Sequence, residues 1–382
     1  MELAEFRRQF PITRTRAYLF SGALAPAAAP VRAAWDDWSS SWSTDPNHIY
    51  TVEMMIGAMD ELRASFARLI GASPESVAIT DSTSRAANIA VRILAARRPG
   101  GNVVIDDGTY PSSAYPWQAA GGHEIRFVPT DDSPDPAAAL AERIDERTAA
   151  VCICHVAPFT GRRHDLRAVA DAAHAHDAPV LVDAAQSAGA VPIDVAADGV
   201  DALVTTAMKW LLGPPGIGLL YLSPELLANA PVLDVGYLGL DAPLGEWPPQ
   251  EMPPVHPDAR RYELGLPSLP GVLAARAGID LLLDVGMEGV HARVQALATR
   301  CIDGLAEQGA DIVTPVDAAA RAGVIAVRHP DPGAVFAECR RCGVDIGAIG
   351  CIRVDPHAFN DESDVDRFLE VYARVGVPAG AT

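Results

Sequence analysis

Lys209 is the only lysine among the 382 residues, in a chain whose other basic residues are arginines. A primary amine can lose its proton and attack an aldehyde to form an imine, whereas a guanidinium stays protonated and delocalised at any working pH. A GC-rich genome would also favour arginine over lysine, so the count alone does not separate chemistry from codon usage. Lys209 is therefore a candidate for carbonyl chemistry that its surroundings must support.

Asp183 and Gln186 lie in a second segment that suits such an amine. Asp183 ends the apolar run PVLVD, where a solvated surface aspartate is unexpected. Pyridoxal 5'-phosphate (PLP) binds its enzymes through a lysine imine, and an acid against its pyridine nitrogen makes it an electron sink. Asp183 is a candidate for that acid, and Gln186 for a hydrogen bond to the ring hydroxyl. A helix cap or turn after the strand is the alternative interpretation of Asp183.

A hydroxyl-rich turn earlier in the chain is a candidate phosphate site. The segment VAITDSTSRAAN has the pattern of a strand, a turn and a helix, which directs backbone N–H groups and the helix dipole at an anion. Ser82, Thr83 and Ser84 are the candidates, although ordinary capping by Ser82 or Ser84 gives the same pattern. Their position in the chain, ahead of Asp183 and Lys209, favours a phosphate site over ordinary helix capping. No GxGxxG occurs, so the fingerprint of a nicotinamide enzyme is absent.

Strand and helix patterns alternate from about residue 77 to 222 and would position these residues. This alternation predicts an α/β domain with a mixed, mostly parallel sheet, whose ligands lie at the carboxyl ends of the strands. Ser84, Asp183 and Lys209 come at or just after such ends. We predict helices over residues 84–96 and 166–176, and seven strands over residues 77–80, 102–106, 124–128, 149–156, 179–183, 202–206 and 217–222.

The proline-rich stretch at residues 231–257 is predicted to be a long ordered loop that connects two domains. The large domain would span residues 21–257, and a smaller α+β domain would combine residues 1–20 with 258–382. A continuous helical pattern runs from Leu269 to about Leu305. The remaining predicted elements are strands near 324–327 and 351–354 and a last helix over 362–374.

The composition restricts the partners of such a protein. A net charge of -19 makes nucleic acids and acidic membrane surfaces poor partners, because their binders cluster Lys and Arg against phosphates. No apolar run is long enough to span a bilayer and the first residues lack a secretory signal, so we expect a cytoplasmic protein. Six cysteines without such a signal argue against a disulfide framework. Cys339 and Cys342 form a lone CxxC, and we expect no metal site.

The order of the motifs DSTSRAAN, HVAPFTGRRHDL, VDAAQSAG, TTAMKW, RYELGLPS and IRVDPHAFN resembles the class V aminotransferase and cysteine desulfurase family over nearly the whole chain. The resemblance implies a PLP-dependent enzyme of fold type I, an amino-acid substrate, and a homodimer with the active site at the subunit interface. It implies Lys209 as the lysine that forms the Schiff base and shuttles protons. Asp183 would contact the pyridine nitrogen, and Gln186 the ring oxygen. The residues that would hold the phosphate are Thr83, Ser84 and Thr206.

Two more residues take roles from the resemblance. Tyr110 falls where relatives place a ring-stacking histidine or aromatic residue, and Arg353 where they bind the substrate carboxylate, which suits a bidentate guanidinium. An interface role for Tyr110 and a surface salt bridge for Arg353 are the alternatives. The chain departs from the family pattern at Met208, where many relatives have histidine, and at 265–268, where Gly-Leu-Pro-Ser replaces Gly-Thr-Pro-Asn. Ser268 is the candidate replacement for the threonine that reaches the phosphate bound by the partner subunit.

The reaction type depends on residues outside these motifs. Sulfur-transfer members of the family carry a nucleophilic cysteine shortly before the substrate arginine, but the corresponding stretch here is GVDIGAIG. Cys351 falls in an apparent strand and Cys342 at a helix end, so we disfavour cysteine desulfurase activity. The leading hypothesis is a lyase that cleaves a carbon–sulfur bond of a cysteine-derived substrate in specialised metabolism, whereas an aminotransferase, an epimerase, a decarboxylase and a non-catalytic PLP-binding regulator stay open. The entry segment places Phe20, Ser21 and Gly22 where relatives have polar residues, which predicts an unusual substrate pocket.

Overall fold

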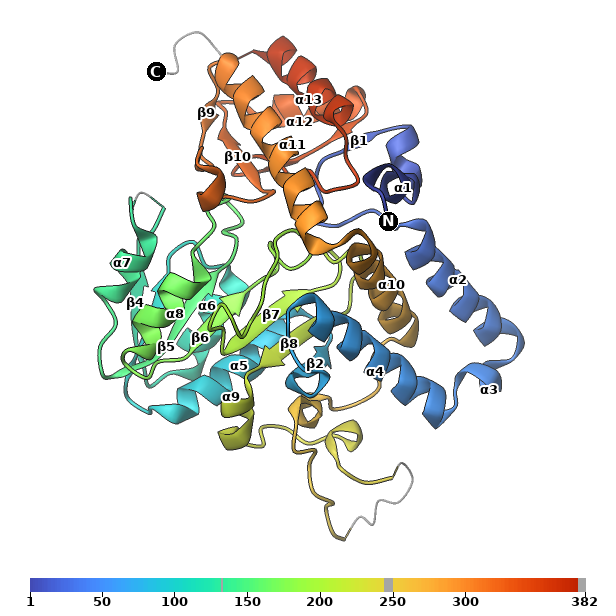
Figure 1. Cartoon of the computed structure of the whole chain (residues 1–382), viewed down its shortest axis with the longest axis vertical. Helices are drawn as coiled ribbons and strands as arrows, with labels where there is room; N and C mark the ends of the chain where they lie inside the picture. The colour runs from blue at the N-terminus through green and yellow to red at the C-terminus, as the bar shows by residue number, and fades with distance from the viewer. Residues whose placement is uncertain (132, 244–249, 377–382) are drawn as a thin grey trace.

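A computed structural model describes residues 1–131, 133–243 and 250–376 of the protein (Figure 1). Its central strands are β2 (Val77–Thr80), β3 (Asn102–Asp106), β4 (Glu124–Val128), β5 (Thr148–Cys154), β6 (Val180–Asp183), β7 (Ala202–Thr206) and β8 (Gly218–Leu222). They form one sheet in the order β2-β8-β7-β6-β5-β3-β4. β8 runs antiparallel to β2 and β7, and the other neighbours are parallel. The predicted α/β domain with a mixed, mostly parallel seven-stranded sheet is confirmed.

Both faces of this sheet are buried, which explains why its strands are continuous apolar runs. Successive side chains point to opposite faces, so Val104 and Val182 join one core cluster while Val103 and Leu181 join another. The helix α5 packs on the second cluster, and α4 and α8 pack on the first. The helices around the sheet are α4 (Val52–Leu69), α5 (Thr83–Arg97), α6 (Pro111–Ala120), α7 (Pro136–Ala141), α8 (Leu166–His174) and α9 (Pro224–Asn229).

The C-terminal part contains a second, smaller sheet, seen at the top of Figure 1 beside three helices. Its strands are β9 (Asp311–Ile312), β10 (Ile325–Arg328), β12 (Gly347–Ile349) and β13 (Cys351–Val354), all antiparallel to their neighbours. The helices here are α11 (Met287–Glu307), α12 (Pro332–Arg341) and α13 (Glu362–Val375). The predicted smaller α+β unit is therefore present.

The helical pattern predicted from Leu269 to about Leu305 is confirmed, and the structure divides it into two helices. α10 (Leu269–Val285) ends at Gly286, whose positive φ of 85° stops the helix, and α11 begins directly after it. The periodicity continues across Gly286 because both helices bury apolar faces in the same core. A change of helix axis at a single glycine leaves the spacing of the apolar residues unaltered, so the sequence pattern does not reveal it.

The described parts of the proline-rich stretch contain little regular structure, as predicted. They hold a short 3₁₀ helix over Tyr237–Gly239 and an isolated bridge between Leu240 and Val255, while part of the predicted loop, at 244–249, lies outside the described residues. The domain limits at 21–257 and 258–382 stay a prediction. In the described ranges, no helix is long and apolar enough to cross a membrane.

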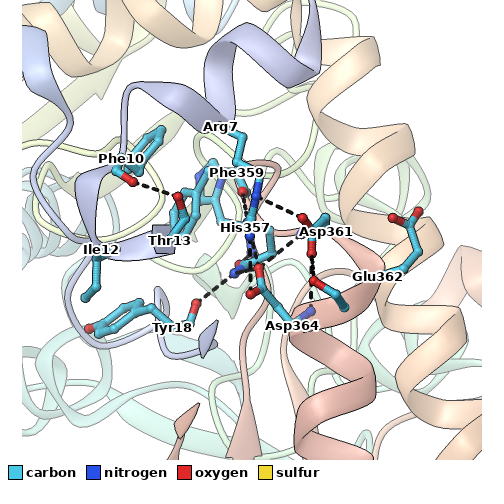
Figure 2. Close-up of polar contacts among 12 residues, drawn as sticks. Arg7, Phe10, Ile12, Thr13, Tyr18, His357, Phe359, Asp361, Glu362 and Asp364 are labelled. Atoms are coloured by element: carbon cyan, nitrogen blue, oxygen red, sulfur yellow. Dashed lines mark hydrogen bonds and ion pairs between the residues drawn. The ribbon is translucent and has the colours of Figure 1, made fainter. Parts of the chain in front are cut away.

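The first residues of the chain join the C-terminal elements. α1 (Leu3–Arg8) and a 3₁₀ turn over Pro11–Arg14 lead into β1 (Ala17–Tyr18), which pairs in parallel with β11 (Val344–Asp345). Figure 2 shows Arg7 between the loop after β13 and the start of α13. Its guanidinium donates to the Phe359 carbonyl and the Asp364 carboxylate, each at 2.7 Å, and lies 2.9 Å from Asp361. The rings of Phe10 and Phe359 stack at 4.3 Å.

Replacing Arg7 with alanine is expected to destabilise this junction. The substitution leaves the buried Asp364 carboxylate without its charged donor, and we expect the free energy of unfolding to fall by about 1–3 kcal/mol. Urea denaturation followed by circular dichroism measures this. Arg328→Ala is the control, because its ion pair with Asp311 is exposed and should contribute less than about 1 kcal/mol. Equal losses in the two variants would contradict the assignment.

Candidate active site

A cavity of about 440 Å³ lies at the carboxyl ends of the central strands, where an α/β sheet places its ligands. Three distant segments of the chain meet around it. Strand ends and helix starts of the large sheet supply Thr83, Ser84, Tyr110, Asp183, Gln186, Thr206 and Lys209. The small sheet supplies Gly347, Ile349 and Arg353, and the entry segment supplies Phe20, Gly22 and Ala23. The structure thus brings the predicted catalytic, cofactor and carboxylate-binding residues to one cavity, whereas Ser268 and Ser21 do not line it.

Lys209 follows β7 and places its amine inside this cavity. Burial lowers the pKa of the amine, and the negative charge of Asp183 opposes part of that effect. A lowered pKa increases the neutral fraction near neutral pH, and only the neutral amine can attack a carbonyl or accept a proton. Its Nζ atom lies 5.9 Å from the centre of the Tyr110 ring, so the two side chains share the space where a flat ring would lie.

Asp183 ends β6 with a fully buried carboxylate whose oxygens are both hydrogen-bonded. Ser113 donates its hydroxyl to one oxygen at 2.6 Å, and the backbone N–H of Ala185 donates to the other at 3.0 Å. Burial raises the pKa of Asp183, while these donors and the charge of Lys209 oppose the rise. The sequence did not reveal Ser113, because its contact with Asp183 joins two separate strand–helix units. The fixed carboxylate is suited to a cationic N–H partner.

The start of α5 has the geometry of an anion site. The Ser82 hydroxyl accepts the backbone N–H of Arg85 at 3.2 Å, so Ser82 acts as the helix cap, as the alternative interpretation held. Thr83 and Ser84 begin the helix and line the cavity, where its N–H groups and dipole favour negative charge. β8 approaches closely at Gly218, since a Cβ there would lie 2.4 Å from the Ser82 backbone.

Gln186 and Tyr110 lie on the cavity wall. The Gln186 amide donates to the Gly22 carbonyl at 3.0 Å and accepts the indole N–H of Trp210 at 2.8 Å. This amide therefore connects the entry segment to the strand ends, and its contact with a ring oxygen stays a prediction. The Tyr110 ring stacks near Phe159 with centroids 6.3 Å apart, and both side chains are partly exposed. An interface role for Tyr110 remains compatible with this exposure.

Arg353 projects from β13 into the cavity, 5.7 Å from the Phe20 ring. Its Nη2 atom lies 2.7 Å from the carboxylate of Asp355. The Arg353 side chain is 11% exposed and that of Asp355 is fully buried, so this ion pair is not the surface salt bridge considered as the alternative. Asp355 was not among the predicted site residues, because it follows the end of β13 and acts through its contact with Arg353.

A family comparison agrees with this geometry: residues 17–335 match the model of the family described as aminotransferase class-V. The chain belongs to the class V aminotransferase family. A kynureninase from Deinococcus radiodurans is 30% identical over 90% of this chain and 85% of its own length. Among solved structures, a cysteine desulfurase from Thermococcus onnurineus superposes with a TM-score of 0.86, at 23% identity over 98% of both chains. The complex of the cystine C-S lyase C-DES with cysteine persulfide has a TM-score of 0.85, at 22% identity over 95% of this chain and 98% of the other.

Membership of the class V aminotransferase family makes this chain a PLP-dependent lyase or transferase of fold type I, as the sequence motifs implied. The residues present fit the cofactor. A cavity amine, a fully buried carboxylate and hydroxyls at a helix start are the groups that the aldehyde, the pyridine nitrogen and the phosphate of PLP require. Lys209, Asp183 and Thr83 with Ser84 would hold these three parts, and Thr206 lines the same side of the cavity.

Two departures from the class V pattern have structural correlates. Met208 lines the cavity, and its backbone carbonyl accepts the N–H of Ala25 at 2.8 Å, which ties the entry segment to the lysine loop. Ser268 caps α10, because its hydroxyl accepts the Gly271 N–H at 3.3 Å. That hydroxyl therefore has a local structural role in this chain. A contact of Ser268 with a phosphate on the partner subunit stays a prediction.

Proposed function

We propose that this enzyme is a lyase that cleaves the carbon–sulfur bond of a cysteine-derived amino acid. The observation that carries the proposal is the absence of cysteine from residues 345–350. Gly347 and Ile349 of this stretch line the cavity together with Arg353. Cys351 is buried in β13, and Cys342 lies at the far end of α12. Without a mobile thiol to take up sulfur, the sulfur-containing fragment would leave as a free product.

Cys154 is the one cysteine that lines the cavity in the described part of the chain, and it is a poor sulfur acceptor. It ends β5, and burial raises the pKa of its thiol well above the usual value, with Asp183 adding to the rise. The reactive form of cysteine is the thiolate, so a buried neutral thiol is inert. Cys154 therefore packs as a small apolar residue in the floor of the cavity.

The side chains of this site suit elimination from the β-carbon. PLP, when bound, delocalises the electron pair left when a substrate loses its Cα proton. Lys209 would accept that proton at Nζ and return it to the sulfur, so that the bond between Cβ and sulfur breaks and the sulfur-containing fragment leaves as a thiol. The remaining fragment reacts with water, so the net products are pyruvate, ammonia and the thiol. Asp183 would hold the ring nitrogen of PLP in its protonated form, and Arg353 would orient the substrate carboxyl group.

The experiment that tests this function uses the PLP-loaded protein and a panel of cysteine S-conjugates, without any keto acid. We expect pyruvate and ammonia over many turnovers, with the visible band of the cofactor unchanged between cycles. A single stoichiometric change of that band, reversed by adding a keto acid, would instead make the enzyme an aminotransferase. Racemisation of the substrate without pyruvate would make it an epimerase, and carbon dioxide release would make it a decarboxylase.

A second copy of this chain is the partner that we propose for α2 (Ala29–Thr44), α3 (Pro46–Ile49) and the start of α4. In α2 only Val31 is buried, so most of this helix faces outward. Large exposed apolar side chains lie on α2, directly after α3 and at the start of α4, namely Trp35, Trp42, Tyr50, Val52 and Met54. Light scattering after gel filtration is expected to give twice the chain mass. A monomer at concentrations well above about 10 μM would refute the dimer.

A further inference from the structure

Arg353 lines the cavity that holds Lys209, and its ion-pair partner Asp355 is fully buried behind it. Arg353 lies on β13 and Asp355 directly follows that strand, and the charges of the two side chains act on Lys209 in opposite directions. A positive charge alone would attract a substrate carboxylate strongly, because the cavity is largely apolar and screens charge poorly. The negative charge of Asp355 therefore offsets the positive charge that the guanidinium presents to a substrate.

The entry segment is built around this pair. A Cβ atom at Gly22 would lie 2.4 Å from Nη2 of Arg353 and 2.4 Å from the Asp355 carboxylate. Any side chain at that position would displace one of the two groups. The backbone of Asp355 also pairs with the segment, since its N–H donates to the Leu19 carbonyl at 2.7 Å and its carbonyl accepts from Ser21 at 3.3 Å. The pair is thus held in place from two sides.

The hydrogen-bonding capacity of the pair is only partly used. Nη2 of Arg353 bonds Asp355, while Nε and the second carboxylate oxygen of Asp355 are buried without a partner. Nη1, which makes no hydrogen bond to a described residue and is not buried like Nε, is the donor that remains for a substrate. A substrate carboxylate at Nη1 would share one guanidinium with Asp355 and leave one uncompensated negative charge. A carboxamide or an ester would meet no such repulsion.

We propose, on the basis of the function proposed above, that Asp355 determines the specificity of the Arg353 subsite. By compensating the charge of the guanidinium, it lets the site accept an amino acid whose carboxyl group is an amide or ester nearly as well as the free acid. Two carboxylates that share a guanidinium lie roughly 6 Å apart, and at an effective dielectric constant of about 20–40 this repulsion changes affinity by about 10–100-fold.

The test compares an acid with its amide, using 3-phenylpropanoate and 3-phenylpropanamide bound to the PLP-loaded protein at about pH 8. These ligands have no amine, so calorimetry reports the subsite without any chemistry at the cofactor. Their phenyl group suits the apolar side chains of Phe20 and Phe159 at the cavity. We expect the wild type to bind the two ligands within about tenfold of each other. Asp355→Asn should strengthen binding of the acid by at least about tenfold and leave the amide unchanged.

The controls distinguish the effect of removing a charge at the Arg353 subsite from the general effect of removing a buried carboxylate. Glu263→Gln removes another buried carboxylate, which pairs with Arg63 at 2.7 Å outside the cavity, and should leave the ratio of acid to amide affinity unchanged. Arg353→Gln should weaken binding of the acid. If Asp355→Asn does not fold, Asp355→Ser removes the same charge. The ratio of acid to amide affinity in the wild type is also a test. Acid binding more than about 100-fold tighter than amide binding would overturn the proposal.

Two further results would overturn it: an unchanged ratio in Asp355→Asn, and no binding of either ligand to any variant. The proposed function is judged separately, by the change in visible absorption that S-benzyl-cysteine and its amide produce in the same proteins. A response to these amines without a shift in the ratio would retain the enzyme and reject the role of Asp355. A shift in the ratio of acid to amide affinity without any absorption change on adding these amines would retain the role of Asp355 and reject the proposed enzyme function.

Discussion

Lys209→Ala is expected to abolish turnover and to remove the visible band of the lysine-bound cofactor. The variant loses both the amine that holds PLP and the base that accepts the Cα proton. General base catalysis alone contributes about 10²–10⁴-fold, so we expect kcat to fall by at least about 10⁴-fold when the two roles are lost together. Product formation over hours and an absorption spectrum of the purified variant measure these effects. Turnover at the wild-type rate would reject the whole scheme.

The matched control is Lys209→Arg, which keeps the positive charge and most of the side-chain length. A guanidinium neither forms an imine nor accepts a proton at working pH, so this variant should be as inactive as the alanine variant. Activity in Lys209→Arg would show that charge, not imine chemistry, is what the position provides. The amine of Lys209 is the only lysine amine in the chain, so borohydride reduction of the loaded protein should fix one PLP to the peptide that contains it.

The sheet was predictable from the sequence because both its faces are buried. Apolar runs such as Val77–Thr80 and Ala202–Thr206 have strand length and are bounded by polar turns, and their limits agree with β2 and β7. β5 ends at Cys154, two residues before the predicted limit, because the chain bends at His155, although both His155 and Val156 are buried. The pattern of hydrophobicity reports burial, and burial extends beyond the last strand hydrogen bond.

The cavity residues were predictable only in part. Asp183 and Lys209 follow apolar strands, and this position marks them without knowledge of the tertiary fold. Ser113 and Asp355 matter because of what they contact, and these contacts join elements far apart in the chain or act through the charge of a neighbour. The position of the break between α10 and α11 at Gly286 was not predictable either, since one glycine is compatible with a helix interior or with its end.

Asp183→Asn is the other substitution with a large expected effect. Asparagine has nearly the same shape, so it can still accept the Ser113 hydroxyl or the Ala185 N–H, but it carries no charge. A neutral amide in a fully buried position does not stabilise a protonated pyridine nitrogen, and the cofactor then withdraws electrons less strongly. We expect kcat to fall by at least about 100-fold, the usual cost of removing one preorganised electrostatic group from an active site. The affinity for PLP should fall as well.

Asp201→Asn provides the control for this variant. Asp201 lies at the opposite end of the same pair of strands, where its carboxylate accepts the Val180 N–H at 2.7 Å and contacts His174. That variant removes a partly buried acid from the same sheet without touching the cavity, so its kcat should stay within about twofold of the wild type while its stability falls. Thermal denaturation of both variants separates lost catalysis from lost fold. If Asp183→Asn kept kcat within twofold, the electron sink would not depend on this carboxylate, and the ring nitrogen would have to find its acid elsewhere in the site.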